Sequence, residues 1–192
     1  MSSSRRSLNF AIGMVLGIAV SLGSLDASAA DKSKHEASIT AAEDALEQYT
    51  ENDPDLNDHL QNAAGYVVFP EIGKAGVVVG GGGGDGILFE KGVPVGKAKV
   101  TFVNVGAQIG GQRFSEVIIF RDKAALKDFK RGRGEFLAGA SAVAAGAGAS
   151  ASLNYKNGVA VMTKTSGGLM AEAVIGGQKF TYMAFTKPEP RT

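Results

Sequence analysis

The sequence contains no cysteine and no tryptophan, and only two histidines and five prolines among 192 residues. Because cysteine is absent, the chain can form no disulfide, no thiolate metal site and no lipid-modified cysteine of the bacterial lipoprotein type. The two histidines, His35 and His59, lie in acidic segments, where we expect exposed side chains. Two histidines without cysteine cannot assemble a closed zinc site, so we expect no metal and no cofactor.

The first 30 residues have the three parts of a secretory signal. An early arginine pair gives the positive start, residues 10–20 form an apolar stretch too short for a typical membrane span, and Ala-Ser-Ala at 27–29 supplies small residues before a cleavage site. We expect removal of the signal before Ala30 or Asp31 and export to the periplasm, where the protein can be peripheral to an envelope membrane. An uncleaved N-terminal anchor is the alternative.

Charge and glycine are distributed unevenly along the remaining chain. Residues 31–64 hold nine acidic and two basic residues, a net charge of −7, whereas residues 65–192 hold nine acidic and 16 basic residues, a net charge of +7. All 24 glycines after the signal lie beyond residue 64. We interpret the chain as an acidic helical segment packed on one glycine-rich, β-dominated domain. The basic excess of that domain points to an anionic partner, unless the acidic segment covers it.

Two amphipathic helices are predicted in the acidic segment. The first carries an apolar stripe at spacings of three and four residues, formed by Ile39, Ala42, Leu46 and Tyr49. Asp53 is expected to cap the second helix before Pro54, and Gly65 to end it in the left-handed conformation. The apolar face of the second helix consists of Leu56, Leu60 and Ala63. Both faces are narrow, so the helices should dock on the rest of the domain.

Beyond residue 65, alternating apolar and polar residues predict β-strands. Residues 102–113 are expected to form one half-buried antiparallel strand, and residues 114–121 its more buried neighbour. Residues 138–152 contain nothing larger than valine. We expect them to pack in an ordered way at backbone distance, and a flexible linker is the alternative. Further strands are predicted at residues 158–163, 169–175 and 179–185.

A short helix is predicted to interrupt these strands. Asp122 should cap it, Leu126 and Phe129 should pack inward, and Gly132 should end it. The sequence therefore predicts an α+β fold. It consists of a strongly bent antiparallel sheet or partial barrel, N-terminal helices packed on it, and one inserted helix.

Five consecutive glycines, residues 80–84, raise the question of a nucleotide or calcium site. The run fits the dinucleotide pattern G-x-G-x-x-G, but Gly92 and Pro94 follow too soon for the helix that such a site needs. Residues 80–88 also fit one copy of a calcium-binding nonapeptide, with Asp85 as ligand, but the second stacked copy is missing. We therefore expect a structural role, in which another element such as a helix approaches the glycines closely.

Signatures of common catalytic sites are also missing. The sequence has no G-x-S-x-G, no H-E-x-x-H and no thiol, and no pair of acids stands out from the solvated background. We therefore expect a protein that is not an enzyme. An envelope hydrolase with an unrecognised site is the alternative.

The order of motifs from residue 63 to residue 185 resembles the SYLF domain family. The resemblance is carried by AAGYVVFPEIGKAG at residues 63–76, GGGGGDGIL at 80–88, GAQIGGQ at 106–112 and SGGLMAEA at 166–173. It implies a lipid-binding module whose partner is a phospholipid or membrane surface and not nucleic acid. This chain departs from the family in two places. Many relatives have a tryptophan shortly before the proline at Pro94, whereas this chain has none. The basic segment of eukaryotic relatives is reduced here to Lys164, and an exported protein would not meet actin, so we expect no actin partner.

Basic residues are the candidates for lipid contact. One cluster lies at the predicted end of the short helix and consists of Lys127, Lys130, Arg131 and Arg133. Such cations can attract anionic head groups, at about 1 kcal/mol each near a charged surface, or they can be a solvated helix end. Lys97 and Lys99 are a second candidate, and an apolar groove between the acidic helices and the glycine-rich sheet is a third.

The function expected from these features is non-enzymatic binding of phospholipid in the bacterial envelope through basic surface residues. A small outer-membrane β-barrel and an envelope structural protein are further alternatives, because an exported chain with alternating strands permits them.

Export can be tested directly. Periplasmic protein should begin at Ala30 or Asp31 when its N-terminus is sequenced, because the preceding small residues fit a signal peptidase. A full-length product that stays in the cytoplasm would contradict this prediction.

Overall fold

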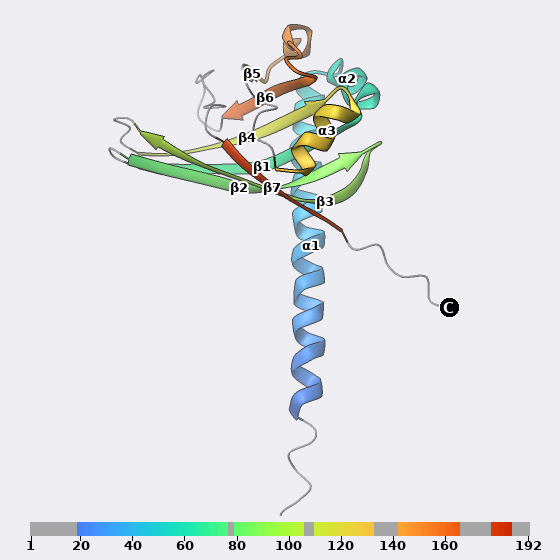
Figure 1. Cartoon of the computed structure of the whole chain (residues 1–192), viewed down its shortest axis with the longest axis vertical. Coiled ribbons are helices and arrows are strands. Elements are labelled where there is room, and N and C mark those ends of the chain that lie inside the picture. The colour runs from blue at the N-terminus through green and yellow to red at the C-terminus, as the bar shows by residue number, and fades with distance from the viewer. Residues whose placement is uncertain (1–18, 77–78, 106–109, 133–141, 166–177, 186–192) are drawn as a thin grey trace, which may run out of the picture. The chain divides into compact units, whose positions relative to one another are not determined.

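The computed structural model describes residues 19–76, 79–105, 110–132, 142–165 and 178–185 (Figure 1). It confirms the α+β class, with helices packed on a seven-stranded sheet. Helices α1, α2 and α3 span Ala19–Asn52, Leu56–Asn62 and Lys123–Lys130, and a short 3₁₀ helix, η2, spans Ala149–Ser152.

The chain divides into two compact units, residues 1–37 and 38–192. The first unit contains the N-terminal part of α1, where Lys32 and Glu36 form an exposed ion pair one helical turn apart, with 3.9 Å between Nζ and Oε1. The second unit contains the rest of α1 and all the other elements. Within the described ranges, no helix is long and apolar enough to cross a membrane.

The sheet is mixed and has the strand order β5-β6-β4-β1-β2-β3-β7. Neighbouring strands are antiparallel except β5 and β6, which are parallel. The outer strands β5 and β7 are not paired with each other, so the sheet that these seven described strands form is not closed. In chain order the strands span Gly65–Gly76, Val79–Glu90, Val93–Val105, Gly110–Phe120, Ala142–Ala144, Val159–Thr165 and Gln178–Ala184.

Bulges and aromatic contacts show that the sheet is strongly bent. The register shifts between Phe69 and Ile72 in β1 and between Leu88 and Phe89 in β2, and bulges of this kind bend a strand and increase its twist. Phe180 of β7 lies with its ring centroid 5.9 Å from that of Phe69, although β2 and β3 separate these strands in the sheet. The sheet therefore curls around one of its faces, which we call the inner face.

The inner face holds a hydrophobic core that α3 covers. Phe129 of α3 packs against Phe120 of β4 and Phe180 of β7, with ring centroids 4.9 Å and 5.7 Å away. Fully burying a side chain of this size stabilises a fold by about 1.5–3 kcal/mol. Strand residues that share this core include Val67, Leu88, Val100, Ile118 and Val161.

The opposite face of the sheet, the outer face, packs against the N-terminal helices. Ala42 and Tyr49 of α1 are buried there, and the Tyr49 hydroxyl donates a hydrogen bond of 2.9 Å to the backbone carbonyl of Ser115 in β4. α2 contributes Leu56 and Leu60 to the same core. The predicted docking of both helices on the sheet is therefore confirmed. The strand residues beneath them include Val68, Ile87, Val117 and Met162.

Two predictions about the ends of α2 are wrong. Asp53 does not cap α2, because its buried carboxylate accepts hydrogen bonds from the backbone N–H and the hydroxyl of Ser150, at 2.5 Å and 2.9 Å. Hydrogen bonds to a carboxylate are stronger in a buried site than in contact with water, so the two bonds from Ser150 stabilise Asp53 more than capping an exposed helix end would. Gly65 does not end α2, since the helix stops at Asn62 and Ala63 is already extended. Gly65 instead begins β1.

The single strand predicted at residues 102–113 is also wrong. β3 ends at Val105 and β4 begins at Gly110, and β1 and β2 lie between these strands in the sheet. Of the residues predicted as a separate neighbour, 114–121, all but the last are instead the continuation of β4, which ends at Phe120. Because the alternating pattern runs across both strand ends, a period of two could not locate the break.

Most of the predictions for residues 122–185 that the structure tests are confirmed. Asp122 caps α3 by accepting two backbone N–H bonds of 2.9 Å, its two predicted apolar residues are buried, and Gly132 follows with a φ of 70°. The strands predicted at 158–163 and 179–185 are confirmed as β6 and β7, whereas 169–175 lies outside the described residues. Within the small-residue segment, residues 142–152 include β5 and η2, and residues 138–141 are not described.

The consecutive glycines lie in the first half of β2, Gly86 follows them after Asp85, and the inner face needs the lack of a side chain in this stretch. A Cβ at Gly86 would lie 2.6 Å from the Phe69 ring and 2.6 Å from the carbonyl oxygen of Val68. At Gly82 the Phe102 ring fills the equivalent space, with one ring carbon 2.6 Å from the Cβ position. The expected close approach is therefore made by side chains and carbonyls of the sheet itself, and not by a helix.

A methyl group on the inner face of β2 should be costly. Gly86→Ala is expected to lower the free energy of unfolding by about 1–3 kcal/mol, because the methyl overlaps both a ring and a backbone carbonyl. Gly73→Ala is the matched control in β1, since a Cβ there meets nothing within 4 Å, and it should change stability by less than about 0.5 kcal/mol. Urea unfolding of the two variants tests this, and equal losses would contradict it.

Candidate functional site

The basic cluster at the end of α3 is partly neutralised. Lys130 forms an ion pair with Glu90 of β2, and its Nζ lies 5.5 Å from the centroid of the Tyr182 ring. Lys127 and Arg131 are exposed, and the fourth predicted cation, Arg133, lies outside the described residues. Because α3 covers the inner face, the described cations of this cluster lie on that side of the sheet.

Lys97 and Lys99 lie on the other side. They alternate along β3 with Ala98 and Val100, which are buried in the inner core, so both lysines lie on the outer face. The structure therefore does not bring the described candidate cations together on one surface. It places them in two groups, separated by the sheet.

Lys179 of β7 joins Lys97 and Lys99 on the outer face, and sequence reasoning missed it. β7 pairs with β3 so that Lys179 lies opposite Thr101, two residues along β3 from Lys99. We call these three lysines the basic face. The alternation in residues 178–184 could have shown that Lys179 points away from the core, but only the pairing of β3 with β7 brings residues so distant in sequence together.

The basic face is surrounded by small or short side chains. Gly83 of β2 lies directly opposite Thr101 in the register, and Thr181 of β7 lies opposite Lys99. Asp85 is the acidic neighbour, paired with Lys99 across the strands. Met183, paired with Lys97, is 71% exposed. The arrangement is an open sheet surface with three cations, one anion and one projecting apolar side chain.

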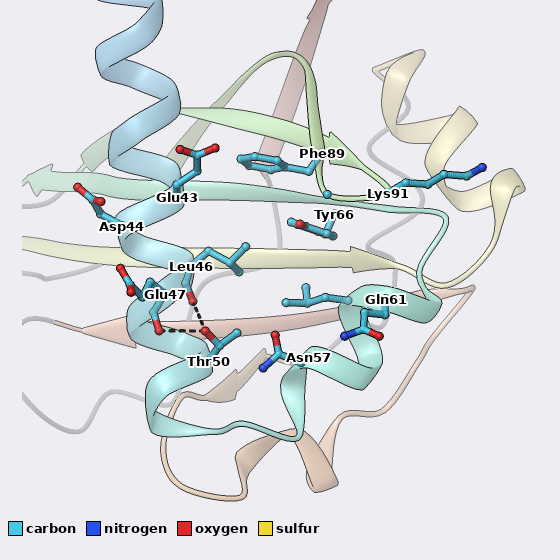
Figure 2. Close-up of a pocket in the computed structure, with 12 residues that line it drawn as sticks. Glu43, Asp44, Leu46, Glu47, Thr50, Asn57, Gln61, Tyr66, Phe89 and Lys91 are labelled. Atoms are coloured by element: carbon cyan, nitrogen blue, oxygen red, sulfur yellow. Dashed lines mark hydrogen bonds between the residues drawn. The ribbon is translucent and has the colours of Figure 1, made fainter.

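A cleft of about 670 Å³ lies between the N-terminal helices and the sheet, where the sequence predicted an apolar groove (Figure 2). Its floor includes Tyr66 and Phe89, whose rings are stacked with centroids 5.3 Å apart. Leu46 of α1 and Leu60 of α2 add apolar walls. The remaining lining is polar and consists of Glu43, Asp44, Glu47, Thr50, Asn57, Gln61, Lys91 and Gly92.

The cleft has an acidic rim, which the prediction of a lipid groove did not include. In Figure 2 the Glu43 side chain points toward the Phe89 ring, and the Lys91 side chain extends away from the helix carboxylates. Burial raises the pKa of the Tyr66 hydroxyl, and the negative charge of Glu43 raises it further. The negative charge of Glu43 therefore acts at the phenol, and this end of the cleft favours positive charge.

A smaller hollow of about 190 Å³ lies beside α2. His59 is not simply exposed there as predicted: it is half-buried, its Nδ1 lies 3.1 Å from the Tyr155 hydroxyl, and the two rings stack with centroids 5.9 Å apart. Arg121 lies on the same Tyr155 ring, 5.2 Å from its centroid. These contacts join α2 to the segment after η2, which is a structural role.

One carboxyl group is fully buried in the inner core. Oε2 of Glu116 in β4 accepts a hydrogen bond of 3.2 Å from Nε2 of Gln178 in β7, whereas Oε1 of each side chain has no hydrogen-bond partner among the described residues. Burial raises the pKa of Glu116 to about 7, and the bond from Gln178 opposes that rise. With no exposed surface, this carboxyl cannot touch a substrate in the structure described here.

Comparisons with known proteins do not assign the chain. No family model matches the sequence, and no curated protein matches it. Within the described part of the chain, no group of three histidine, aspartate or glutamate side chains could hold a metal ion. The candidate sites are therefore the basic face, the exposed cations of α3 and the acidic-rimmed cleft.

Glu116 should make stability fall as pH rises. Its folded pKa of about 7 exceeds the ordinary value of 4.5, so its contribution is fully present below pH 4.5 and is lost as pH rises through 7. Relative to Glu116→Gln, the parent should lose about 3 kcal/mol of unfolding free energy between pH 4.5 and pH 8. Urea unfolding of both proteins across this range provides the measurement. Parallel pH profiles would contradict the assignment.

Proposed function

We propose that the chain is a non-enzymatic module that binds the anionic surface of a phospholipid membrane through the basic face. The observation that carries the proposal is the placement of Lys97, Lys99 and Lys179 on one open surface of the sheet. Each lysine held near an anionic bilayer contributes about 1 kcal/mol. Three such contributions, reduced by one nearby carboxylate, give weak and salt-sensitive association of a peripheral kind.

The lysines of the basic face project above their neighbours in the sheet. The glycine and threonine residues beside them are small, and the exposed Met183 can enter the head-group region. Because α1 and α2 pack on the same outer face, a membrane meets this part of the sheet beside the helices. Lysine side chains are long enough to reach phosphates while their stems lie on the sheet. A surface of this form suits many head groups at once better than a single small molecule in a pocket.

The end of α3 is the weaker alternative for the same partner. Its central cation, Lys130, is already paired with Glu90, so approach to a membrane would compete with an existing interaction. Lys127 and Arg131 are free to interact with solvent but lie at a helix C-terminus, where they stabilise the helix dipole in any case. The motif order that resembles the SYLF family, and the expected export signal, both support phospholipid as the partner.

Charge reversal on the two sides of the sheet separates the alternatives. Lys99→Glu combined with Lys179→Glu removes two attractions and adds two repulsions, worth about 4 kcal/mol or about a thousandfold in affinity at low salt. The matched control is Lys127→Glu with Arg131→Glu, which makes the same charge change on α3. Flotation with phosphatidylglycerol vesicles should collapse for the first variant and persist for the second, and phosphatidylcholine vesicles should show little difference.

Salt provides an internal check on the same experiment. The difference between parent and basic-face variant should shrink between about 0.1 M and 1 M salt, as the Debye length falls from about 10 Å to about 3 Å. If the folded Lys99/Lys179 variant floats as well as the parent, the basic face does not bind membranes. If the α3 variant alone loses binding, the site lies on the inner side of the sheet.

A further inference from the structure

We infer that the cleft between α1, α2 and the sheet binds the primary ammonium group of an amine-bearing phospholipid, with the apolar part of that molecule on the aromatic floor. The recognition of an ammonium group rests on the cleft alone. The choice of a phospholipid as its carrier rests on the proposed function. The cleft shares no residue with the basic face, so the two sites can be tested separately.

The first argument is an unpartnered hydroxyl inside the cleft. Tyr66 is 6% exposed and lines the cleft, and none of the side-chain hydrogen bonds found among the described residues involves its hydroxyl. Figure 2 shows this hydroxyl directed toward the α1 side of the cleft. The phenol is neutral near pH 7, as its ordinary pKa of 10 already requires, and offers both a proton and an oxygen lone pair. Glu116 Oε1 and Gln178 Oε1 are the fully buried unpaired side-chain atoms of the described residues, so the Tyr66 oxygen is accessible from the cleft and can exchange water for a polar partner that enters it.

The second argument is the charge beside that hydroxyl. Glu43 is close enough to Tyr66 for its negative charge to raise the phenol pKa, and Asp44 and Glu47 continue the acidic rim along α1. The only cation of the described lining, Lys91, extends away from these carboxylates in Figure 2. An ammonium group between Glu43 and Tyr66 can donate one N–H to the carboxylate and one to the phenol oxygen. A phosphate or carboxylate in that place would be repelled.

The third argument is the apolar remainder of the cleft. Phe89, Leu46 and Leu60 provide surface for a chain attached to the ammonium group, and the volume of about 670 Å³ lies within the usual range for small-molecule sites. Tyr66 and Phe89 project from the same outer face that carries the basic face. A lipid that rests on this side of the sheet therefore has access to both surfaces, which is why we assign a lipid amine and not a protein lysine.

Matched single-chain probes test the recognition of the ammonium group. The full chain is titrated with n-octylammonium and with octanoate, both below their micelle concentrations, while the NMR signals of Tyr66 and Phe89 are followed. Octylammonium should bind at least about tenfold more tightly, because one charge-assisted hydrogen bond in a partly buried site is worth about that factor. Equal binding of the two probes would overturn the proposal.

Two substitutions locate the ammonium group. Glu43→Gln should weaken octylammonium binding about tenfold, whereas Glu51→Gln, an exposed control on the same helix, should leave it unchanged. Tyr66→Phe should weaken octylammonium but not octyltrimethylammonium, which has no N–H to donate. Thermal unfolding shows whether each variant is folded. If Tyr66→Phe does not fold, the affinity of Glu43→Gln for octylammonium alone tests the ammonium site. Identical affinities for the Glu43 and Glu51 variants would overturn the assignment.

A second titration tests the carrier. Dihexanoyl phosphatidylethanolamine should bind more tightly than dihexanoyl phosphatidylglycerol and more tightly than Nα-acetyl-lysine methylamide, which presents the same amine without a lipid. If the lysine derivative binds more tightly, the cleft recognises a protein amine and the lipid assignment is wrong. Flotation on phosphatidylglycerol vesicles involves neither Glu43 nor Tyr66. A variant of the basic face should therefore lose flotation and keep octylammonium binding, whereas a variant of the cleft should lose octylammonium binding and keep flotation.

Discussion

The packing of aromatic rings against the glycines of β2 sets the geometry of the domain. Phe69 and Phe102 lie where side chains at Gly86 and Gly82 would otherwise be. Because these rings lie directly on the glycine backbone, the sheet can curl until Phe180 of β7 contacts Phe69 of β1 across the inner face. One short helix, α3, then suffices to cover the inner core, and the longer helices are left to pack on the outer face. On that face Lys99 and Lys179 remain exposed, and Lys97 is partly buried.

The sequence predicted those features that depend on neighbouring residues. The α3 cap at Asp122 and the left-handed Gly132 were predicted correctly because both depend on conformations within a few residues. Partners distant in sequence decided the rest. Asp53 was given the wrong role because its true donor, Ser150, is 97 residues away. Lys179 was missed because only strand pairing brings it to β3, and the Tyr66 hydroxyl gave no signal because its significance depends on helix packing.

The opposite charges of the two chain segments do not cancel by direct pairing. Within the described ranges, no ion pair joins an acid of residues 38–62 to a cation of the sheet. The polar contact from α1 to a sheet lysine is instead made by a neutral side chain, Gln48, which accepts from Lys164 at 3.3 Å. Three acids of α1 line the cleft, while the lysines of the basic face lie on β3 and β7. The segregation by sign therefore gives the outer face two regions with opposite preferences.

The open sheet also has a consequence for self-association. An unpaired edge exposes backbone N–H and C=O groups to which a second chain can add a strand, and natural proteins restrain this with short edge strands and with lysine. β5 has three residues, which is too short to guide such pairing, whereas β7 has seven and pairs only with β3 among the described strands. Lys179 lies on β7, and so one of the three ammonium groups of the basic face also opposes edge-to-edge aggregation of the protein.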